Sequence, residues 1–254
     1  MGWGVVVATD QGAEWLLPWW WECYSRHHKQ EVAFVDFGMS EEAKNWCQTK
    51  GLLIPFVGQS DFVKPKEHVG KKTQKRWEAI YGPNVWKARQ NWFKKPLAML
   101  HTPFQKSIWM DLDCEVCKPI DAVFEGINAG VLGAVRVEKR GHYNSGVIVY
   151  DKEASLLKAW ADACLKKHGS CIGDETVLSG LIGKNRYLFK EIAPEFNWMM
   201  GWGYHPDLKI AHWAASWGKL CIETMGGIQN YITQCGEARE GCEVFSQREN
   251  GLFF

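Results

Sequence analysis

The chain has 254 residues, 46% of them hydrophobic, and a formal net charge of +1 at neutral pH. A chain of this length forms one large core rather than two full domains, because single cores stop growing at about 250–300 residues. The small net charge provides no global field that would recruit nucleic acid or an anionic membrane. We therefore expect a single domain over residues 1–254 and no nucleic-acid partner.

The nine cysteines are odd in number and irregularly spaced, in a chain large enough to fold without disulfides. This pattern predicts a reduced, cytoplasmic setting, and the first residues lack the pattern of a signal peptide. No window approaches about 18 continuous apolar residues, so we expect no transmembrane segment. Cys114 and Cys117 have half of a zinc-site spacing, but no second pair matches it, and no zinc site is predicted.

Strands and helices alternate at the start of the chain. Short β-branched runs at Val5–Ala8, Val32–Val35 and Leu52–Val57 predict strands, and longer segments at Trp15–Tyr24 and Glu41–Lys50 predict helices. Alternation of this kind is typical of a parallel sheet with helices on its faces. The fold class predicted is therefore α/β, with a mostly parallel, twisted central sheet.

A basic stretch follows over residues 64–95, with ten Lys or Arg and two Glu. Such a stretch is either the solvated surface of helices and loops or a basic rim that attracts a diphosphate or an anionic acceptor. The sequence leaves both interpretations open.

The pattern continues more loosely after residue 100. Ser107–Met110, Val131–Val137 and Gly146–Tyr150 predict strands, and Ala154–Lys167 predicts an amphipathic helix. A further helix is predicted at Asp174–Ile182, since two carboxylates in a first turn complement the helix dipole. From residue 225 onward the signals are weak and mixed.

Two carboxylates come directly after the buried run 107–110. Asp111 and Asp113 stand at alternate positions, where they could present hard oxygen ligands to Mg²⁺ or Mn²⁺. The same pair could instead only cap the turn that follows the strand.

Three further segments carry polar residues at the ends of predicted elements. Asn144 and Ser145 open a strand, which suits close approach of a ligand or simply a strand-entry turn. Asp174 and Glu175 place a carboxylate pair at the start of a helix. His212 follows a short apolar run, where it is either a nitrogen ligand for a metal or a packed core histidine.

The order of these segments resembles the retaining glycosyltransferases of family eight, which include glycogenin and bacterial lipopolysaccharide galactosyltransferases. The resemblance runs from Val5 to Lys219, and its most specific part combines Trp109–Asp113 with Tyr143–Val147. It implies a GT-A, Rossmann-like fold, a UDP-sugar donor and an Mn²⁺ or Mg²⁺ cofactor. It also implies a nucleotide-binding half over residues 1–115 and an acceptor-side half over residues 116–254.

The resemblance also implies roles for the polar residues. Thr9 and Asp10 match the segment that contacts the uridine. Asp111 and Asp113 match the metal-binding motif, and His212 matches the histidine that completes the metal shell.

The donor sugar and diphosphate have their own matches. Asn144 and Ser145 match residues near the sugar, and Asp174 matches a carboxylate that binds sugar hydroxyls. Glu175 stands where the family has glutamine, which puts an acid in place of a neutral amide beside the anomeric carbon. Lys219 matches the lysine that contacts the diphosphate.

The closing motif departs from the family pattern. The family has His-x-x-Gly-x-x-Lys, whereas here Ala215 takes the first glycine position and Lys219 comes one place late, directly after Gly218. The lysine therefore lies one residue later in the motif than in the family.

These observations predict a metal-dependent transferase that moves a hexose from a UDP-sugar to a hydroxyl acceptor, with retention implied by the resemblance alone. The acceptor is a glycan, a lipid-linked sugar or a protein. Two alternatives stay open: an aspartate-based phosphatase or phosphotransferase, and a non-catalytic protein that binds a nucleotide sugar or a glycan. The sequence does not determine the sugar or the oligomeric state.

Overall fold

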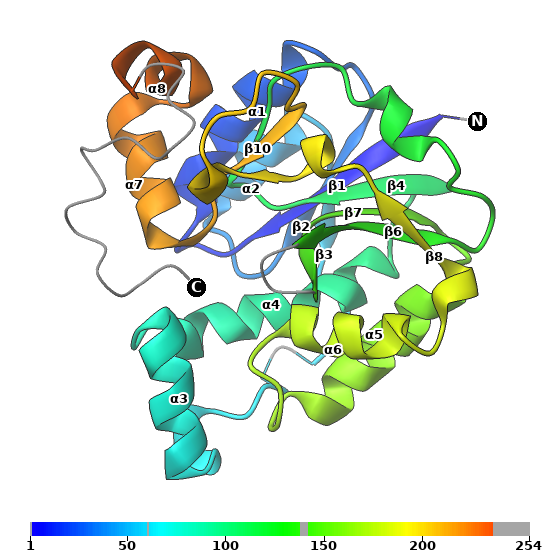
Figure 1. Cartoon of the computed structure of the whole chain (residues 1–254), viewed down its shortest axis with the longest axis vertical. Helices are drawn as coiled ribbons and strands as arrows, with labels where there is room; N and C mark the ends of the chain where they lie inside the picture. The colour runs from blue at the N-terminus through cyan, green and yellow to red at the C-terminus, as the bar shows by residue number, and fades with distance from the viewer. Residues whose placement is uncertain (1, 60, 138–141, 236–254) are drawn as a thin grey trace.

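The β-branched runs of the sequence form the strands of one seven-stranded sheet (Figure 1). The computed structural model describes residues 2–59, 61–137 and 142–235. The strands of this main sheet are β1 (Trp3–Thr9), β2 (Val32–Asp36), β3 (Leu52–Pro55), β4 (Lys106–Met110), β6 (Leu132–Val137), β7 (His142–Asp151) and β8 (Phe189–Ile192).

Eight α-helices and a small second sheet complete the described part of the chain. The strands of the small sheet are β5 (Cys114–Val116), β9 (Trp198–Met199) and β10 (Ile210–His212). The helices are α1 (Leu17–Ser25), α2 (Glu41–Gln48), α3 (Lys71–Tyr81), α4 (Val85–Met99), α5 (Ser155–Lys167), α6 (Asp174–Ile182), α7 (Ala215–Met225) and α8 (Ile228–Cys235).

Most neighbouring strands of the main sheet are parallel. The order is β3-β2-β1-β4-β7-β6-β8, and β7 runs antiparallel to both of its neighbours, β4 and β6. Parallel strands end at the same edge of a sheet, so the loops after β1, β2 and β4 lie together. Because β7 is antiparallel, its first residues reach that same edge, beside the residues that follow β4.

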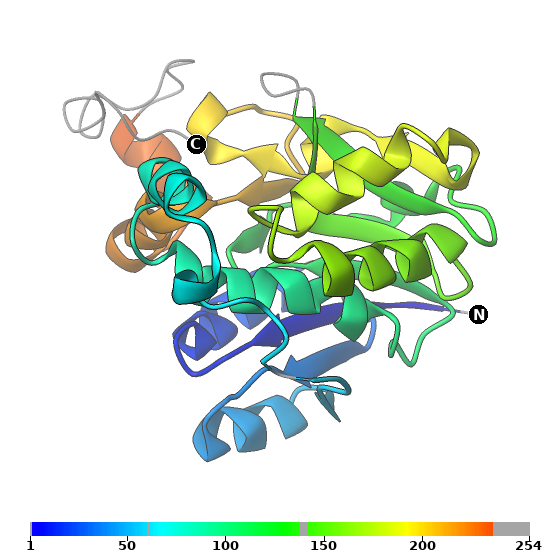
Figure 2. The same ribbon diagram turned by 90° about the horizontal axis from the view of Figure 1, so that it is seen from below.

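Both faces of the main sheet are buried, and alternate residues of β1 point into different cores. Val5 and Val7 pack in a core that includes α1 and α2, whereas Val6 packs in a core that includes α4, α5 and α6. Figure 2 shows α4, α5 and α6 side by side over one face of the sheet. Burial on two faces explains why these strands read as continuous apolar runs in the sequence.

The small sheet brings distant segments together. β5 follows the Asp111–Asp113 segment directly, and β10 pairs with it antiparallel so that His212 is opposite Cys114. The backbone N–H of Trp213 donates to the carbonyl oxygen of Asp113 at 2.9 Å. A histidine about a hundred residues later in the chain is thereby fixed beside the second aspartate.

The predicted α/β class and mostly parallel sheet are confirmed. Each predicted strand and helix has a counterpart, and β7 includes Asn144 and Ser145, which were expected to open a strand. The short strands β5, β8, β9 and β10 and the helices α3, α7 and α8 were not predicted. The basic stretch forms α3 and most of α4. Within the described ranges no helix is both long and apolar enough to cross a bilayer. Of the weakly patterned end of the chain, α8 is described, and residues 236–254 lie outside the described residues.

Candidate functional site

Asp111 is the first residue after β4, and its side chain is held by two donors. The ammonium of Lys95, on α4, donates to Oδ2 at 2.6 Å, and the indole Nε1 of Trp109 donates to Oδ1 at 2.8 Å. Burial alone would lower the pKa of Lys95, but the Asp111 carboxylate outweighs this effect and the pKa is raised. Both oxygens of Asp111 are therefore oriented by groups from the main fold.

Asp113 lies between a lysine and a histidine. Its Oδ2 is 2.6 Å from the ammonium of Lys219, on α7, and its Oδ1 is 3.4 Å from Nε2 of His212. Burial would raise the pKa of this carboxyl, but Lys219 and His212 more than compensate, and the pKa lies well below its ordinary value. Asp113 is therefore a stable, buried anion.

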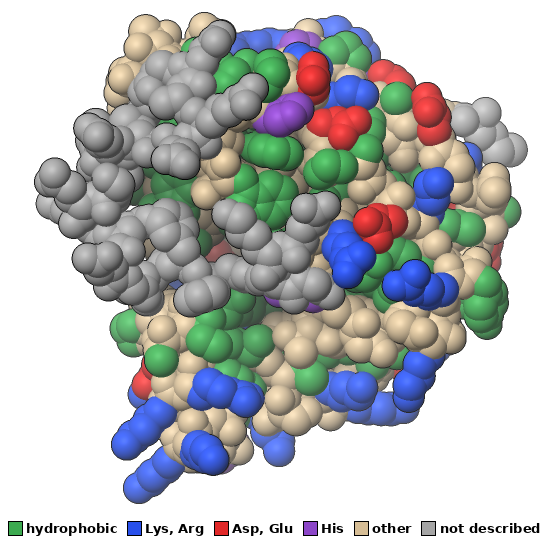
Figure 3. All heavy atoms as spheres, viewed as in Figure 1, with side chains coloured by type: hydrophobic (Ala, Val, Ile, Leu, Met, Phe, Trp, Pro, Cys, Tyr) green, Lys and Arg blue, Asp and Glu red, His purple; other side chains and the backbone are tan. Residues whose placement is uncertain are grey.

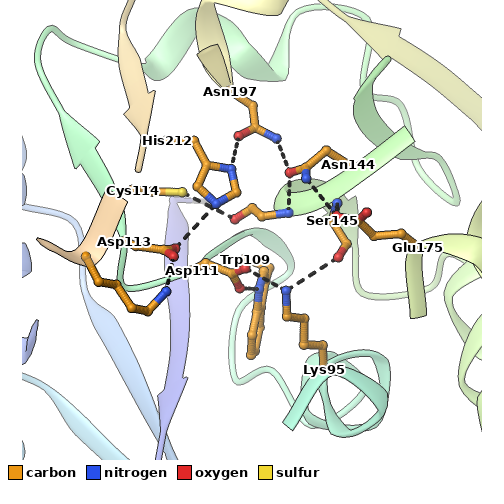
Figure 4. Close-up of polar contacts among 12 residues, drawn as sticks. Lys95, Trp109, Asp111, Asp113, Cys114, Asn144, Ser145, Glu175, Asn197 and His212 are labelled. Atoms are coloured by element: carbon orange, nitrogen blue, oxygen red, sulfur yellow. Dashed lines mark hydrogen bonds and ion pairs between the residues drawn. The ribbon is translucent and has the colours of Figure 1, made fainter. Parts of the chain in front are cut away.

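The two aspartates belong to one cluster (Figure 4). They form ion pairs with different lysines, and His212 adjoins Asp113. Ligand atoms of Asp113, Cys114 and His212 all lie within 4.8 Å of one another, so the segment can converge on one cation. Of these three groups, the carboxylate of Asp113 and the imidazole of His212 fit Mn²⁺ or Mg²⁺, and Asp111 lies outside the set.

His212 is packed against a glycine that cannot carry a side chain. A Cβ at Gly146 would lie 2.2 Å from Cε1 of the imidazole. The other ring nitrogen, Nδ1, is 2.8 Å from Oδ1 of Asn197, which is fully buried. The glycine that follows Asn144 and Ser145 in β7 therefore makes room for the histidine ring.

The residues that open β7 contact the start of α6. Nδ2 of Asn144 donates to Oε1 of Glu175 at 2.7 Å, and the backbone N–H of Ser145 donates to the same oxygen at 3.1 Å. The hydroxyl of Ser145 is 3.4 Å from the ammonium of Lys95. Lys95 therefore links this group to Asp111.

Asp174 is buried beside this group at the start of α6. Burial is the main cause that raises its pKa to about 7, with Lys95 opposing and Glu175 adding to the effect. Its Oδ2 has no hydrogen-bond partner among the described residues. A buried carboxyl that titrates near neutrality is typical of functional sites.

The departures in the closing motif have a structural explanation. Ala215, at the family's first glycine position, has φ of 67°, a left-handed conformation that favours glycine. A Cβ at Gly218 would lie 2.1 Å from the carbonyl oxygen of Trp213, so a glycine is required there. Lys219 follows at once, and its ammonium reaches Asp113.

Thr9 and Asp10, at the end of β1, form a turn of their own. The Thr9 hydroxyl donates to the carbonyl oxygen of Asp10 at 3.0 Å, and the Asp10 carboxylate accepts from the backbone N–H of Gly12 at 2.9 Å. They lie at the same edge of the sheet as the cluster, but neither of these hydrogen bonds joins it.

Two residues of the cluster were not identified from the sequence. Lys95 belonged to a stretch interpreted as a solvated surface or as a basic rim, although it lies between Phe93 and Pro96, which are apolar and buried. Asn197 precedes a two-residue strand and has no pattern around it that could have marked it.

No family model matches this chain, and no curated protein matches it. Solved structures do match, and the class of protein they define is that of the GT-A glycosyltransferases. The chain is similar to the glycosyltransferase GlyE of Streptococcus pneumoniae TIGR4, with a TM-score of 0.59 and 17% identity over 85% of this chain. The match covers 55% of GlyE, so this chain spans about half the length of that protein.

Two shorter glycosyltransferases are matched over nearly their whole length. Galactosyltransferase LgtC, in complex with donor and acceptor sugar analogs, has a TM-score of 0.55 and 14% identity over 87% of this chain and 94% of LgtC. Mouse xyloside xylosyltransferase 1 has a TM-score of 0.51 and 16% identity over 83% of this chain and 96% of its own. These are structures of the family-eight type, as the sequence resemblance predicted, and at such identities they show that this chain has the GT-A fold.

Proposed function

We propose that this chain is a metal-dependent glycosyltransferase that moves a hexose from a UDP-sugar to a hydroxyl acceptor with retention of configuration. The observation that carries the proposal is that Asp113 and His212 lie close enough to share one cation, at the edge of a GT-A sheet where Asp111 follows β4. That edge, at the carboxyl ends of the parallel strands, is where such folds bind nucleotides.

In this proposal the metal ligands are Asp111, Asp113 and His212. A divalent cation bound there supplies Lewis-acid stabilisation of the negative charge that develops on the departing diphosphate. Lys219 contributes a second positive charge. Its side chain is 40% exposed, so its ammonium can turn from Asp113 toward the diphosphate.

The donor sugar is proposed to lie against β7 and α6. Asn144 and Ser145 would approach it from the strand, and the unpartnered oxygen of Asp174 would accept a hydrogen bond from a sugar hydroxyl. Thr9 and Asp10 are proposed to contact the uridine. The C1–O bond to the diphosphate then breaks, the acceptor oxygen bonds to C1 from the same face, and a β-phosphate oxygen takes the hydroxyl proton.

Glu175 is proposed to stabilise the positive charge that develops at C1. One of its oxygens already accepts from Asn144 and Ser145, so the carboxylate is fixed in place. The similar solved structures include an active-site mutant of LgtC with glutamate in place of glutamine, at 15% identity. The same exchange separates Glu175 from the family motif.

The GT-A fold favours this proposal over the phosphatase alternative, whose aspartates normally follow the first strand of the sheet. We further propose a glycan, a lipid-linked sugar or a protein as the acceptor. The single domain and the cytoplasmic setting predicted from the sequence remain proposals.

The test is release of UDP from UDP-glucose and UDP-galactose by the purified chain, with Mn²⁺ or with EDTA. We expect hydrolysis that requires the metal, and the Asp113→Asn variant should lower its rate on the order of 100-fold or more, because it would lose a ligand to the cation that stabilises the departing charge. In a thermal-shift assay, UDP with Mn²⁺ at a hundred times its dissociation constant should stabilise the wild type by about 2.7 kcal/mol.

The matched control is Asp162→Asn, which replaces an exposed aspartate on α5 that pairs with Lys158. This variant should hydrolyse UDP-sugars at the wild-type rate. Full activity of Asp113→Asn, or wild-type activity that ignores EDTA, would contradict the proposal.

A further inference from the structure

A hydrogen-bonded network of buried amides connects the two sides of the site (Figure 4). It runs from Glu175 on α6 to Asn144 on β7, then to Asn197 before β9, and ends at His212 on β10. The two asparagines and His212 are each less than a tenth exposed. Buried networks of this kind rigidify a site when every member is satisfied.

One backbone donor fixes the direction of every hydrogen bond in this network. The N–H of Gly146 donates to Oδ1 of Asn144 at 2.8 Å, which identifies that atom as the oxygen and leaves Nδ2 to donate to Glu175. Asn197 must therefore present its own Nδ2 to Oδ1 of Asn144, at 2.7 Å. The carbonyl oxygen of Asn197 then faces Nδ1 of His212, at 2.8 Å.

The consequence for the histidine is a single tautomer. Because Oδ1 of Asn197 can only accept, Nδ1 of His212 carries the hydrogen and the neutral ring keeps its lone pair on Nε2. That lone pair faces Oδ1 of Asp113 at 3.4 Å. Two acceptors held face to face leave the position between them suited to a cation.

We propose that Asn197 is a positioning residue that locks His212 in the Nδ1–H tautomer and so aims Nε2 at Asp113. This inference rests on the proposed function, because there Nε2 of His212 is a metal ligand. Outer-shell partners of this kind orient metal-binding histidines, and their loss typically lowers metal affinity about 10–100-fold.

The first test is ¹⁵N NMR of histidine side chains in the metal-free protein, with the His212 signals assigned by their loss in His212→Gln. The wild type should show the Nδ1–H tautomer. Asn197→Ala removes the acceptor and should give a mixture of tautomers, whereas Asn197→Asp keeps an acceptor for Nδ1 and should retain the wild-type tautomer. A residue needed only for packing would not separate these two variants by the tautomer.

The second test is Mn²⁺ affinity by calorimetry. Asn197→Ala should weaken binding about 10–100-fold, whereas Asn185→Ala, which removes an amide bonded to the carbonyl of Leu181 in α6, should leave binding unchanged. The inference is overturned if Asn197→Ala keeps the wild-type tautomer. If the tautomers behave as expected but the wild type binds no Mn²⁺, the lock stands and the proposed metal-dependent function fails.

Discussion

Two neighbouring helices carry the basic stretch of this chain, and their charges have opposite surroundings. On α3 the cations Lys71, Lys72, Lys75 and Arg76 are all exposed. They belong to the group of Lys and Arg side chains over α3 in Figure 3. On α4 three of the four cations, Arg89, Lys94 and Lys95, are buried, and Lys87 is exposed. Cations close together in the sequence are therefore exposed to solvent on one helix and mostly buried in the fold on the next.

The difference follows from what each helix packs against. α4 lies against the main sheet and against α5 and α6, and Figure 1 shows α3 projecting beyond the sheet. Arg89 is buried and donates to the carbonyl oxygens of Ile172, Lys64, Cys171 and His168. Burial lowers the pKa of this guanidinium to about 10. The position of a charge relative to the sheet therefore decides its role, and the charge count of the stretch does not.

The largest loss of stability that this comparison predicts is at Lys95. Lys95→Met should lower the free energy of unfolding by about 3 kcal/mol, because it leaves the half-buried Asp111 without its cation and also removes a positive charge beside Asp174. Urea denaturation measures this loss. Lys72→Met, on the exposed face of α3, is the control and should change the value by less than about 0.5 kcal/mol. If both variants lose the same free energy of unfolding, burial does not determine how much the cations of the two helices contribute to stability.

Asp174, a buried carboxyl beside Lys95, should make the stability of the fold depend on pH. Its pKa is raised to about 7 in the folded protein, so between about pH 4 and 7 the folded state binds more protons than the unfolded state and stability falls as pH rises. Asp174→Asn cannot lose that proton. At pH 8 it should be more stable than the wild type by about 4 kcal/mol, at about 1.4 kcal/mol per pKa unit, and near pH 4 the two should be similar.

Urea denaturation at both pH values measures this difference. Asp162→Asn, at an exposed position, should differ from the wild type by the same small amount at both. A wild-type stability that does not fall between pH 4 and 7 relative to Asp174→Asn would contradict the burial of a charged carboxylate here.

Much of the fold could be predicted because the central strands are buried on both faces. A run such as Val5–Ala8 has no polar residue that would make it ambiguous, and its neighbours repeat the pattern. The start of β7 is polar, yet Asn144 and Ser145 were expected to open a strand and they lie in one, which begins at His142. β8, β9 and β10 are two to four residues long, too short to show any periodicity.

The site could be predicted in part for a related reason. Asp111, Asp113 and His212 adjoin short apolar runs, so their positions follow from the strands. Lys95 and Asn197 come from a helix and from a connection before a two-residue strand, and only the packing of α4 and β10 brings them to the cluster. The local sequence pattern therefore identifies site residues that follow a strand. It does not identify site residues that reach the cluster only through tertiary packing.

The smallest predicted effect is on α3, and its sign is informative. Lys71 and Lys72 occupy the first turn, where the helix dipole disfavours cations and no acidic residue is present. Lys71 with Lys75, and Lys72 with Arg76, are like charges four residues apart, which repel. Replacing all four by Gln should therefore raise the free energy of unfolding by about 0.3–1 kcal/mol at low ionic strength.

The gain should disappear in about 1 M salt, because exposed charges are then screened within about 3 Å. Thermal denaturation at the two salt concentrations measures it. If neutralisation instead lowers stability, the cations of α3 have stabilising partners, as those of α4 do. The two helices would then differ only in how strongly their cations stabilise the fold. If neutralisation raises the free energy of unfolding, the cations of α3 slightly destabilise the folded protein. Lys95 differs from them, because the fold requires its charge.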